Sequence, residues 1–276
     1  MKMKSMVRTV LAMGVASAVS AGAARAADEA AEPVSASVSV PILSSYVWRG
    51  QVLNDKPVIQ PSMSIGKYGF ALSAWANYNL TDRVTGKSQQ FSEVDLDANY
   101  TYNVGPVALK GGIVEYLFPN QQMIMPVNET LVVSTMPSSR EVYGSVGMTD
   151  YSVGCKAFSI SPLLGVNYDF EQVHGVYGNA GLSAKHELCD QMTAGANASL
   201  GMASSSYNDY YFGVDKARLN DGNLGISATY SPVKSLSLTP AIQYTRLLDG
   251  DIRESADMIY WKQDRVVGSL TMGYQF

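Results

Sequence analysis

The sequence predicts an all-β chain that forms one membrane-spanning, up-and-down antiparallel barrel of about twelve strands. Three observations support this fold class. Apolar and polar residues alternate with a period of two along much of the chain. No apolar run after the N-terminal segment reaches the roughly 18 residues of a spanning helix. The last alternating run also stops at Phe276, and a closed barrel in lipid must pair its final strand with its first.

Residues 1–26 are predicted to be a secretory signal peptide that is cleaved. Lys2, Lys4 and Arg8 precede an apolar stretch over residues 10–23. Residues 24–26, Ala-Arg-Ala, have the small-x-small form of a cleavage site. The apolar stretch is short and rich in small residues, which disfavours a membrane anchor.

The remaining chain is expected to be a single domain. Residues 27–36 form at most a short periplasmic tail, and residues 37–276 form the barrel. The 24 Gly, the 17 Tyr and abundant Ser, Asn and Thr favour sheet over helix. Without the four cations of the signal peptide, the 20 Lys and Arg fall to 16 against 24 acidic residues. The net charge near −8 disfavours a polyanion partner, and nothing indicates nucleic-acid binding.

Residues 91–104 are the clearest strand. One face carries Val94, Leu96, Ala98, Tyr100, Tyr102 and Val104, and the other carries Glu93, Asp95, Asp97, Asn99, Thr101 and Asn103. The first face is suited to lipid and the second to water, as in a membrane barrel.

The lengths of the connections predict the orientation of the barrel. Connections after even-numbered strands are short, whereas those near 81–91, 119–138, 204–221 and 249–264 are long. Short periplasmic turns that alternate with longer outer loops are typical of an outer-membrane barrel, and an even strand count returns both termini to the periplasm. The expected strands are 37–49, 57–66, 69–80, 92–104, 106–118, 139–149, 157–170, 175–187, 191–203, 222–232, 235–248 and 265–276.

The opening strand carries a recognisable motif, Ser-Tyr-Val-Trp-Arg-Gly-Gln over residues 45–51. Residues 57–60 (Pro-Val-Ile-Gln), 93–96 (Glu-Val-Asp-Leu) and 141–143 (Glu-Val-Tyr) follow it. The chain resembles the TorF family of bacterial porins, whose members open with Tyr-Val-Trp-Arg-Gly after a signal peptide. The resemblance spans nearly all of the mature chain, and only the first motif is specific. It implies a Gram-negative outer-membrane barrel with a pore, and it supplies no catalytic residues.

Charged residues on the inward faces are candidates for lining the lumen. In a water-filled passage their carboxylates would favour cations over anions. The alternative is that they pair with inward cations and close the interior. A twelve-stranded barrel lies between filled eight-stranded barrels and open sixteen-stranded porins, so the lumen is expected to be narrow. The candidates are Glu93, Asp95, Asp97, Lys110, Asp169 and Glu171.

Cationic residues near the outer ends of the strands are candidates for contact with lipopolysaccharide phosphates, which arginine binds in a bidentate manner. Acidic residues are mixed among them, so solvated loop cations are the alternative. Trp48 is then expected at the membrane interface beside a rim cation. The candidates are Arg49, Arg83, Arg140, Arg246 and Arg265.

Cys155 and Cys189 are expected on neighbouring strands at the periplasmic rim. Either they form a disulfide or they are two unpaired small residues. We expect no metal, no cofactor and no enzyme activity. A lipid hydrolase would need a histidine beside a serine, and no spacing marks His174 or His186 as such a base.

The functional hypothesis is therefore passive diffusion of small polar solutes across a bacterial outer membrane through a narrow, partly acidic lumen. The first alternative is a closed barrel that serves structure or surface interaction, and the second is a barrel lipid hydrolase. The expected partners are outer-membrane lipid, lipopolysaccharide and the barrel-assembly machinery. The terminal Phe276 resembles the signal that this machinery reads in such barrels.

Overall fold

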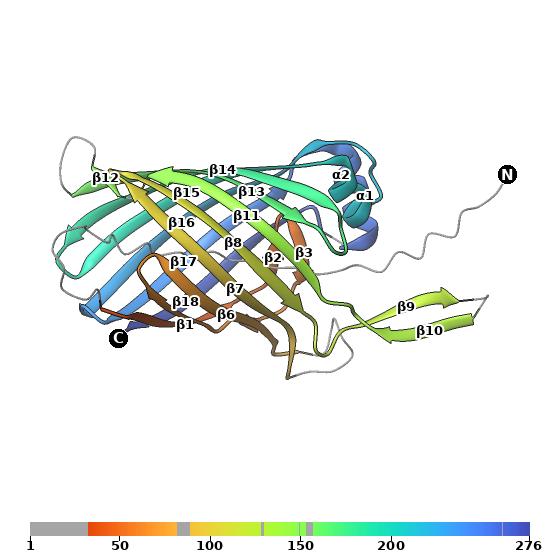
Figure 1. Ribbon diagram of the computed structural model, residues 1–276, viewed down its shortest axis with the longest axis horizontal. Helices are drawn as coiled ribbons and strands as arrows, with labels where there is room; N and C mark the ends of the chain where they lie inside the picture. The colour runs from red at the N-terminus through yellow and green to blue at the C-terminus, as the bar shows by residue number, and fades with distance from the viewer. Residues whose placement is uncertain (1–32, 82–88, 128–129, 149, 153–156, 261) are drawn as a thin grey trace.

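A computed structural model shows a closed antiparallel β-barrel (Figure 1). It describes residues 33–81, 89–127, 130–148, 150–152, 157–260 and 262–276. The predicted signal peptide, most of the predicted tail, Arg83 and Cys155 lie outside the described residues.

Each wall strand pairs antiparallel with its neighbours in the sequence, so the barrel has the predicted up-and-down topology. The last strand pairs with the first from Ser37 opposite Gln275 to Leu43 opposite Ser269, which closes the wall as expected. The twelve wall strands are β1 (Ser35–Leu43), β4 with β5 (Val58–Ile59 and Ser62–Lys67), β6 (Phe70–Asn79), β7 (Gln90–Val104), β8 (Val107–Leu117), β11 (Ser139–Met148), β13 (Phe158–Asp169), β14 (Gly175–Cys189), β15 (Met192–Ala203), β16 (Arg218–Val233), β17 (Leu236–Leu247) and β18 (Asp264–Gln275).

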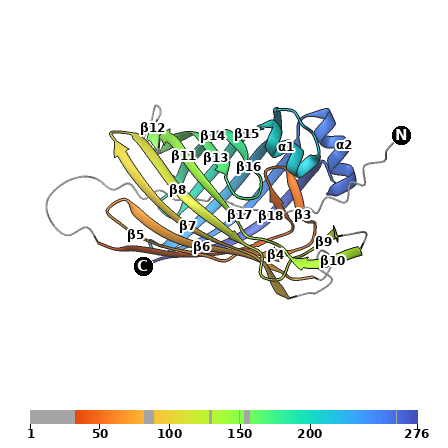
Figure 2. The same cartoon turned by 45° about the vertical axis from the view of Figure 1, so that its right-hand side comes forward.

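The two ends of the barrel differ. Tight turns such as those at Gly69 and Gly105, both with positive φ, lie at one end with the C-terminus, and we call it the turn end. β12 (Tyr151–Ser152) also lies there, paired with β13. The opposite, loop end carries helix α1 (Ser205–Phe212), helix α2 (Gly250–Ile259) and a projecting hairpin of β9 (Gln122–Val127) and β10 (Thr130–Thr135) (Figures 1 and 2). Neither of the two helices has the length and apolar character needed to cross a bilayer; this finding covers the described residues.

Both helices lie in segments that the sequence analysis treated as plain loops. Ser204 caps α1 by accepting a hydrogen bond from Tyr207 N, and Gly213 ends the helix in the left-handed conformation. Asp249 caps α2 by accepting hydrogen bonds from Asp251 N and Ile252 N. These capping residues are the local signals that favour short helices over extended loops.

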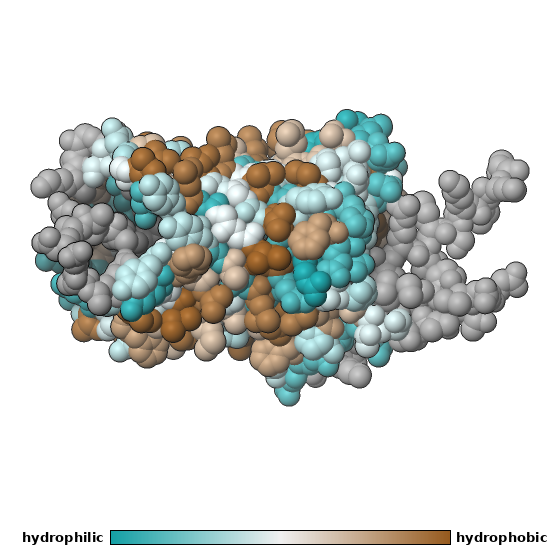
Figure 3. All heavy atoms as spheres, in the orientation of Figure 1, coloured by the Kyte–Doolittle hydropathy of each residue, from teal (hydrophilic) through white to brown (hydrophobic). Residues whose placement is uncertain are grey.

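The outer surface of the wall is apolar. Along β16, Leu224 and Ile226 point outward and are 60% and 63% exposed, while Ser227 and Thr229 on the opposite face point into the barrel. Figure 3 shows hydrophobic residues spread over the flank of the barrel and hydrophilic residues gathered at the loop end. A water-soluble barrel would hide such large apolar side chains in its interior.

The first long loop folds back into the lumen. β1 ends at Leu43, and Ser44 N then donates a hydrogen bond to Gly268 O at 2.9 Å. The next residues form β2 (Tyr46–Trp48) and β3 (Gln51–Asn54), which pair with each other inside the barrel (Figures 1 and 2). We call residues 46–54 the lumenal hairpin. It corrects the expected wall strand over residues 37–49, because residues 46–49 leave the wall.

The tip of the lumenal hairpin is a two-residue turn in which Arg49 and Gly50 have φ of 45° and 80°. Positive φ at both central residues is required by the type I′ turn, which favours tight hairpins. A Cβ atom on Gly50 would lie 2.5 Å from Leu247 Cδ2 and 2.9 Å from Asp221 Cβ. The tip therefore reaches the wall formed by β16 and β17, and only glycine fits there.

The two halves of the lumen are filled differently. In the loop half, the lumenal hairpin, α1, α2 and the wall form one apolar core. In the turn half, inward positions carry polar, partly exposed side chains, as at Ser227, Thr229 and Thr271. Members of the core include Tyr46, Trp48, Leu53, Tyr116, Phe118, Tyr177, Tyr207, Tyr211, Phe212, Leu247, Ile252 and Tyr260.

Replacing Gly50 with alanine should destabilise the protein more than the same change at Gly105. Both positions have positive φ and bear a left-handed penalty of about 1 kcal/mol, but a Cβ on Gly105 has no atom within 4 Å. Gly50→Ala adds overpacking of about 1–3 kcal/mol. Urea unfolding in detergent, followed by tryptophan fluorescence, measures both losses. Equal losses would contradict the placement of the tip.

Candidate functional site

The hairpin tip places a guanidinium group inside the barrel. Arg49 Nη2 lies 2.7 Å from Glu141 Oε1, and Arg49 Nη1 lies 3.1 Å from Glu141 Oε2. The two side chains are 8% and 3% exposed. This is a bidentate, charge-assisted pair away from bulk water, so each partner satisfies a charge that would otherwise be costly to bury.

Aromatic rings surround the same guanidinium. Arg49 Cζ lies 4.4 Å from the ring centroid of Trp48, 4.3 Å from that of Tyr177 and 5.8 Å from that of Tyr207. Cation–π contacts of this kind contribute about 2 kcal/mol when they are desolvated. Trp48 belongs to the hairpin, whereas Tyr177 lies on β14 and Tyr207 on α1.

α1 reaches this position because the start of β14 is a glycine. A Cβ on Gly175 would lie 2.7 Å from Tyr207 N, so a larger residue would push the helix away. Tyr207 then packs against Tyr177 with ring centroids 5.7 Å apart. The side chain of Gln51 donates to Tyr207 Oη at 3.4 Å, which links the helix to the hairpin.

Buried carboxylates form a layer around the hairpin tip. The layer spans several wall strands, and Glu141 stands directly opposite Asp169 in the β11–β13 register. Arg49 neutralises one of these groups by direct contact. We call this set the acidic layer: Glu93, Asp95, Glu141, Asp169 and Asp221, each at most 4% exposed.

Neutral donors hold three further members of the acidic layer. Tyr46 Oη donates to Glu93 at 3.0 Å, and Tyr177 Oη donates to Asp221 at 2.9 Å. Asp169 accepts from Ser139 Oγ at 2.7 Å and from three backbone N–H groups of the following loop. These hydrogen bonds satisfy the carboxylates without cancelling their charge.

Ion pairs join α2 and its capping residue to the segment after α1 and to the start of β16. Lys216 Nζ lies 3.1 Å from Asp251 Oδ2, and Arg218 Nε lies 2.9 Å from Asp249 Oδ2. The hydrogen bond from Lys216 lowers the pKa of Asp251, with a smaller contribution from Arg218. This contribution to stability is present above the ordinary pKa of an aspartate and is lost as the pH falls.

The predicted lumen-lining residues occupy two kinds of position. Glu93, Asp95 and Asp169 belong to the acidic layer, and Asp97 faces the lumen, where it accepts from Tyr143 Oη at 2.7 Å. Lys110 Nζ lies 5.6 Å from the Tyr143 ring centroid. Their part in solute passage stays a prediction.

The prediction that Glu171 lines the lumen is wrong. Its carboxylate lies 3.1 Å from Arg140 Nη1, and Arg140 Nη2 lies 2.9 Å from Glu115 Oε1. Glu115 alternates with buried Val114 and Tyr116 on β8, so this ion-pair cluster faces outward. Glu171 therefore does not line the lumen.

The prediction that Arg49 contacts lipopolysaccharide phosphate at the outer rim is wrong, because its buried side chain cannot reach lipid phosphate. Trp48 is likewise 4% exposed within the lumen and is no interfacial aromatic. Arg265 Nη2 donates to Asp55 O at 2.7 Å, which holds the segment after the hairpin. Arg246 is exposed, and Arg140 is engaged by two carboxylates. Phosphate contact by these two residues stays a prediction.

The described residues contain no assembled catalytic or metal centre. His174 is exposed at the loop end, while Ser204 Oγ accepts from Tyr207 N and Val176 N. No group of three or more His, Cys, Asp or Glu side chains in this part of the chain is placed to hold a metal. The thiol of Cys189 is free and exposed, and Cys155 is not described, so the disulfide stays a prediction.

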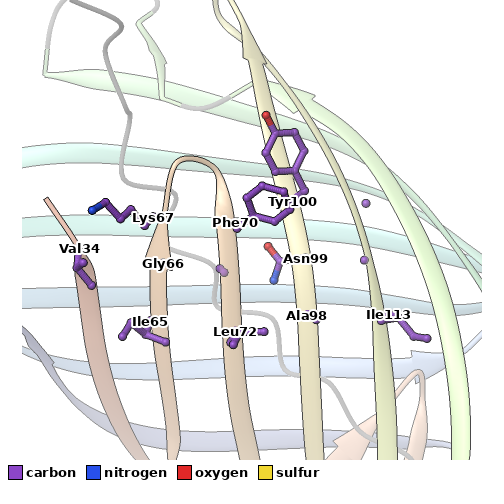
Figure 4. Close-up of a pocket in the computed structure, with 13 residues that line it drawn as sticks. Val34, Ile65, Gly66, Lys67, Phe70, Leu72, Ala98, Asn99, Tyr100 and Ile113 are labelled. Atoms are coloured by element: carbon purple, nitrogen blue, oxygen red, sulfur yellow. The ribbon is translucent and has the colours of Figure 1, made fainter. Parts of the chain in front are cut away.

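A surface hollow lies on the outer face of the wall. It measures about 580 Å³ and is lined by outward-facing apolar side chains, including Ile65, Leu72 and Ile113 (Figure 4). The rings of Phe70 and Tyr100 border it with centroids 4.5 Å apart. It is part of the apolar outer surface.

Sequence reasoning missed the partners of Arg49. Glu141 and Tyr177 alternate with outward apolar residues, as inward positions do, but the alternation does not reveal which of them face each other across the lumen. The Arg49-Gly50 pair was the available signal, because such a pair favours a tight turn.

Comparison with known proteins gives a family. The family model described as "Bacterial protein of unknown function (Gcw_chp)" matches residues 27–246. No curated protein sequence matches the chain. The TorF name expected from the opening motif stays a prediction.

Similar solved structures include the KdgM porin (11% identity, 87% of this chain, 99% of that chain, TM-score 0.49). The NanC porin is 12% identical, with 87% of this chain and 98% of that chain covered and a TM-score of 0.48. An outer membrane channel from Pseudomonas putida F1 is 10% identical, with 90% of this chain and 97% of that chain covered and a TM-score of 0.48. Likeness at this level assigns no activity to the chain.

Glu141→Gln should cost about 3–5 kcal/mol of unfolding free energy, because it leaves the Arg49 charge buried without its partner. The matched control is Glu115→Gln, which breaks the outward pair with Arg140 and should cost about 0–1 kcal/mol, since that pair is partly exposed. Urea unfolding in detergent measures both. A loss below 1 kcal/mol at Glu141 would refute the buried pair.

Proposed function

The chain belongs to the Gcw_chp family of bacterial proteins of unknown function, and we propose that it spans the bacterial outer membrane as a narrow channel for small polar solutes. In the conformation described here the channel is closed in its loop half.

Membrane insertion is supported by the wall. The strands form a closed antiparallel ring, so the backbone groups of the wall pair within the protein. In lipid this is required, because unpaired N–H and C=O groups are costly there. The exposed apolar side chains of the outer face supply the surface that acyl chains contact.

The observation that carries the channel proposal is how the lumen is closed. Wall side chains fill its loop half only together with chain segments at the loop end, namely the lumenal hairpin, α1 and α2. The turn half retains a polar lining suited to water. A passage thus opens when loop segments move, while the wall stays intact.

The acidic layer supports a preference for cations. Glu93 and Asp169 belong to this layer, and ionised carboxylates attract cations and repel anions in a narrow lumen.

A closed barrel for surface interaction is the second candidate. The apolar core in the loop half favours it, because burial of large aromatic side chains stabilises the closed state. The projecting β9–β10 hairpin would then offer a surface to a partner.

Conductance separates the two candidates. We expect the purified protein in a planar bilayer to show brief, cation-selective openings. A variant with residues 46–54 replaced by a short Gly-Ser linker should conduct for longer, because the segment that fills the lumen is gone. If neither protein conducts while both show the heat-modifiable gel shift of a folded barrel, the channel proposal fails.

Ile226→Arg should destabilise the barrel in lipid by about 2–4 kcal/mol, because it places a charge on the outward face midway along β16. Ser227→Arg, one residue along on the inward face, is the control and should cost less. Unfolding in lipid vesicles measures both changes. A reversed order of the two losses would contradict membrane insertion in this orientation of the wall.

A further inference from the structure

We propose that Arg49 is a tethered ligand in a lumenal binding site for small organic cations, and that a solute bearing a guanidinium or alkylammonium group displaces it. The inference rests on the proposed channel function, and it adds the class of solute and the way in which that solute opens the passage.

The first part of the site is the carboxylate of Glu141. It binds the Arg49 guanidinium through two N–H···O contacts of 2.7 and 3.1 Å, a geometry that any free guanidinium reproduces. Glu141 belongs to wall strand β11, so it remains in place when the hairpin leaves. A primary ammonium group would make a weaker, less directional contact with the same oxygens.

The second part of the site is aromatic and does not belong to the hairpin. The ring centroids of Tyr177 and Tyr207 lie 4.3 and 5.8 Å from Arg49 Cζ. They remain on β14 and α1 when Trp48 moves away with the hairpin. One carboxylate and two aromatic faces form the kind of enclosure that selects organic cations over small hydrated metal ions.

The surrounding carboxylates define the sign of the charge that the ligand must carry. Asp169 stands opposite Glu141, and Asp221 accepts from Tyr177 Oη at 2.9 Å. Both carboxylates are buried, and the donors that bind them in the structure are neutral groups. An anionic solute would be repelled here, whereas a cation gains from each neighbouring carboxylate.

The backbone of the tethered ligand favours exchange. Arg49 has φ of 45°, a conformation that is uncommon for a residue with a side chain, so its bound state stores strain. A free cation makes the same contacts without that strain. The free cation competes with the tethered Arg49 side chain, whose effective concentration is on the order of millimolar. Displacement is therefore expected at solute concentrations in that range.

Single-channel recording with methylguanidinium chloride tests the inference. On wild-type protein, about 10 mM of this salt should raise the fraction of time open several-fold, and sodium chloride at equal ionic strength should not. In Arg49→Ala the passage should open without ligand, and methylguanidinium should then reduce the current by binding in the path. Arg49→Gln serves the same purpose should the alanine variant fold poorly.

Arg140→Ala is the matched control. It also removes an arginine that is engaged by carboxylates at the loop end, but on the outward face of the wall. It should respond to methylguanidinium as wild type does. An equal effect of Arg140→Ala and Arg49→Ala would overturn the assignment to the lumen.

A binding measurement separates this inference from the channel proposal. In the Arg49→Ala background, isothermal titration calorimetry should show saturable binding of methylguanidinium, and adding Glu141→Gln should abolish that binding. Saturable, Glu141-dependent binding without current in any variant would support the site and contradict the channel. Absence of saturable binding would overturn the site, whatever the currents show.

Discussion

The rest of the structure depends on one constraint: a guanidinium buried inside the barrel must be neutralised and enclosed. Arg49 meets it through Glu141 on one side and aromatic rings on the others. That requirement explains neighbouring features. The tip of the hairpin turns at Gly50, and β14 begins with Gly175 so that α1 can bring Tyr207 close. Without the ion pair, the hairpin would carry an unpaired charge into a closed interior, which is costly.

The number of strands explains why loop segments occupy the lumen. Side chains can fill the interior of an eight-stranded barrel, but twelve strands enclose more space than wall residues can fill. Here the lumenal hairpin and two helices supply the missing volume in the loop half, and polar residues line the turn half.

The wall could be predicted from the sequence because inward and outward positions differ in polarity. Residues expected as a strand over 92–104 form β7 (Gln90–Val104), and the final strand pairs with the first as expected. The lumenal hairpin could not be predicted from periodicity, because Tyr46 and Trp48 alternate just as in a wall strand. Apolar side chains in a packed lumen and in lipid give the same pattern. The prediction from the sequence was therefore correct in placing Arg49 near the loop end. It was wrong in placing the side chain at the outer rim, because the side chain lies inside the barrel.

The environment of Trp48 tests the lumenal position of the hairpin most directly. In a variant that retains Trp48 alone, reconstituted in lipid, we expect weak quenching by acrylamide in water and by brominated acyl chains in the bilayer. Both results follow because the packed core of the loop half surrounds the ring. Strong quenching by the brominated chains would place Trp48 at the membrane interface, and strong quenching by acrylamide would place it in an exposed loop. Either result would contradict the account.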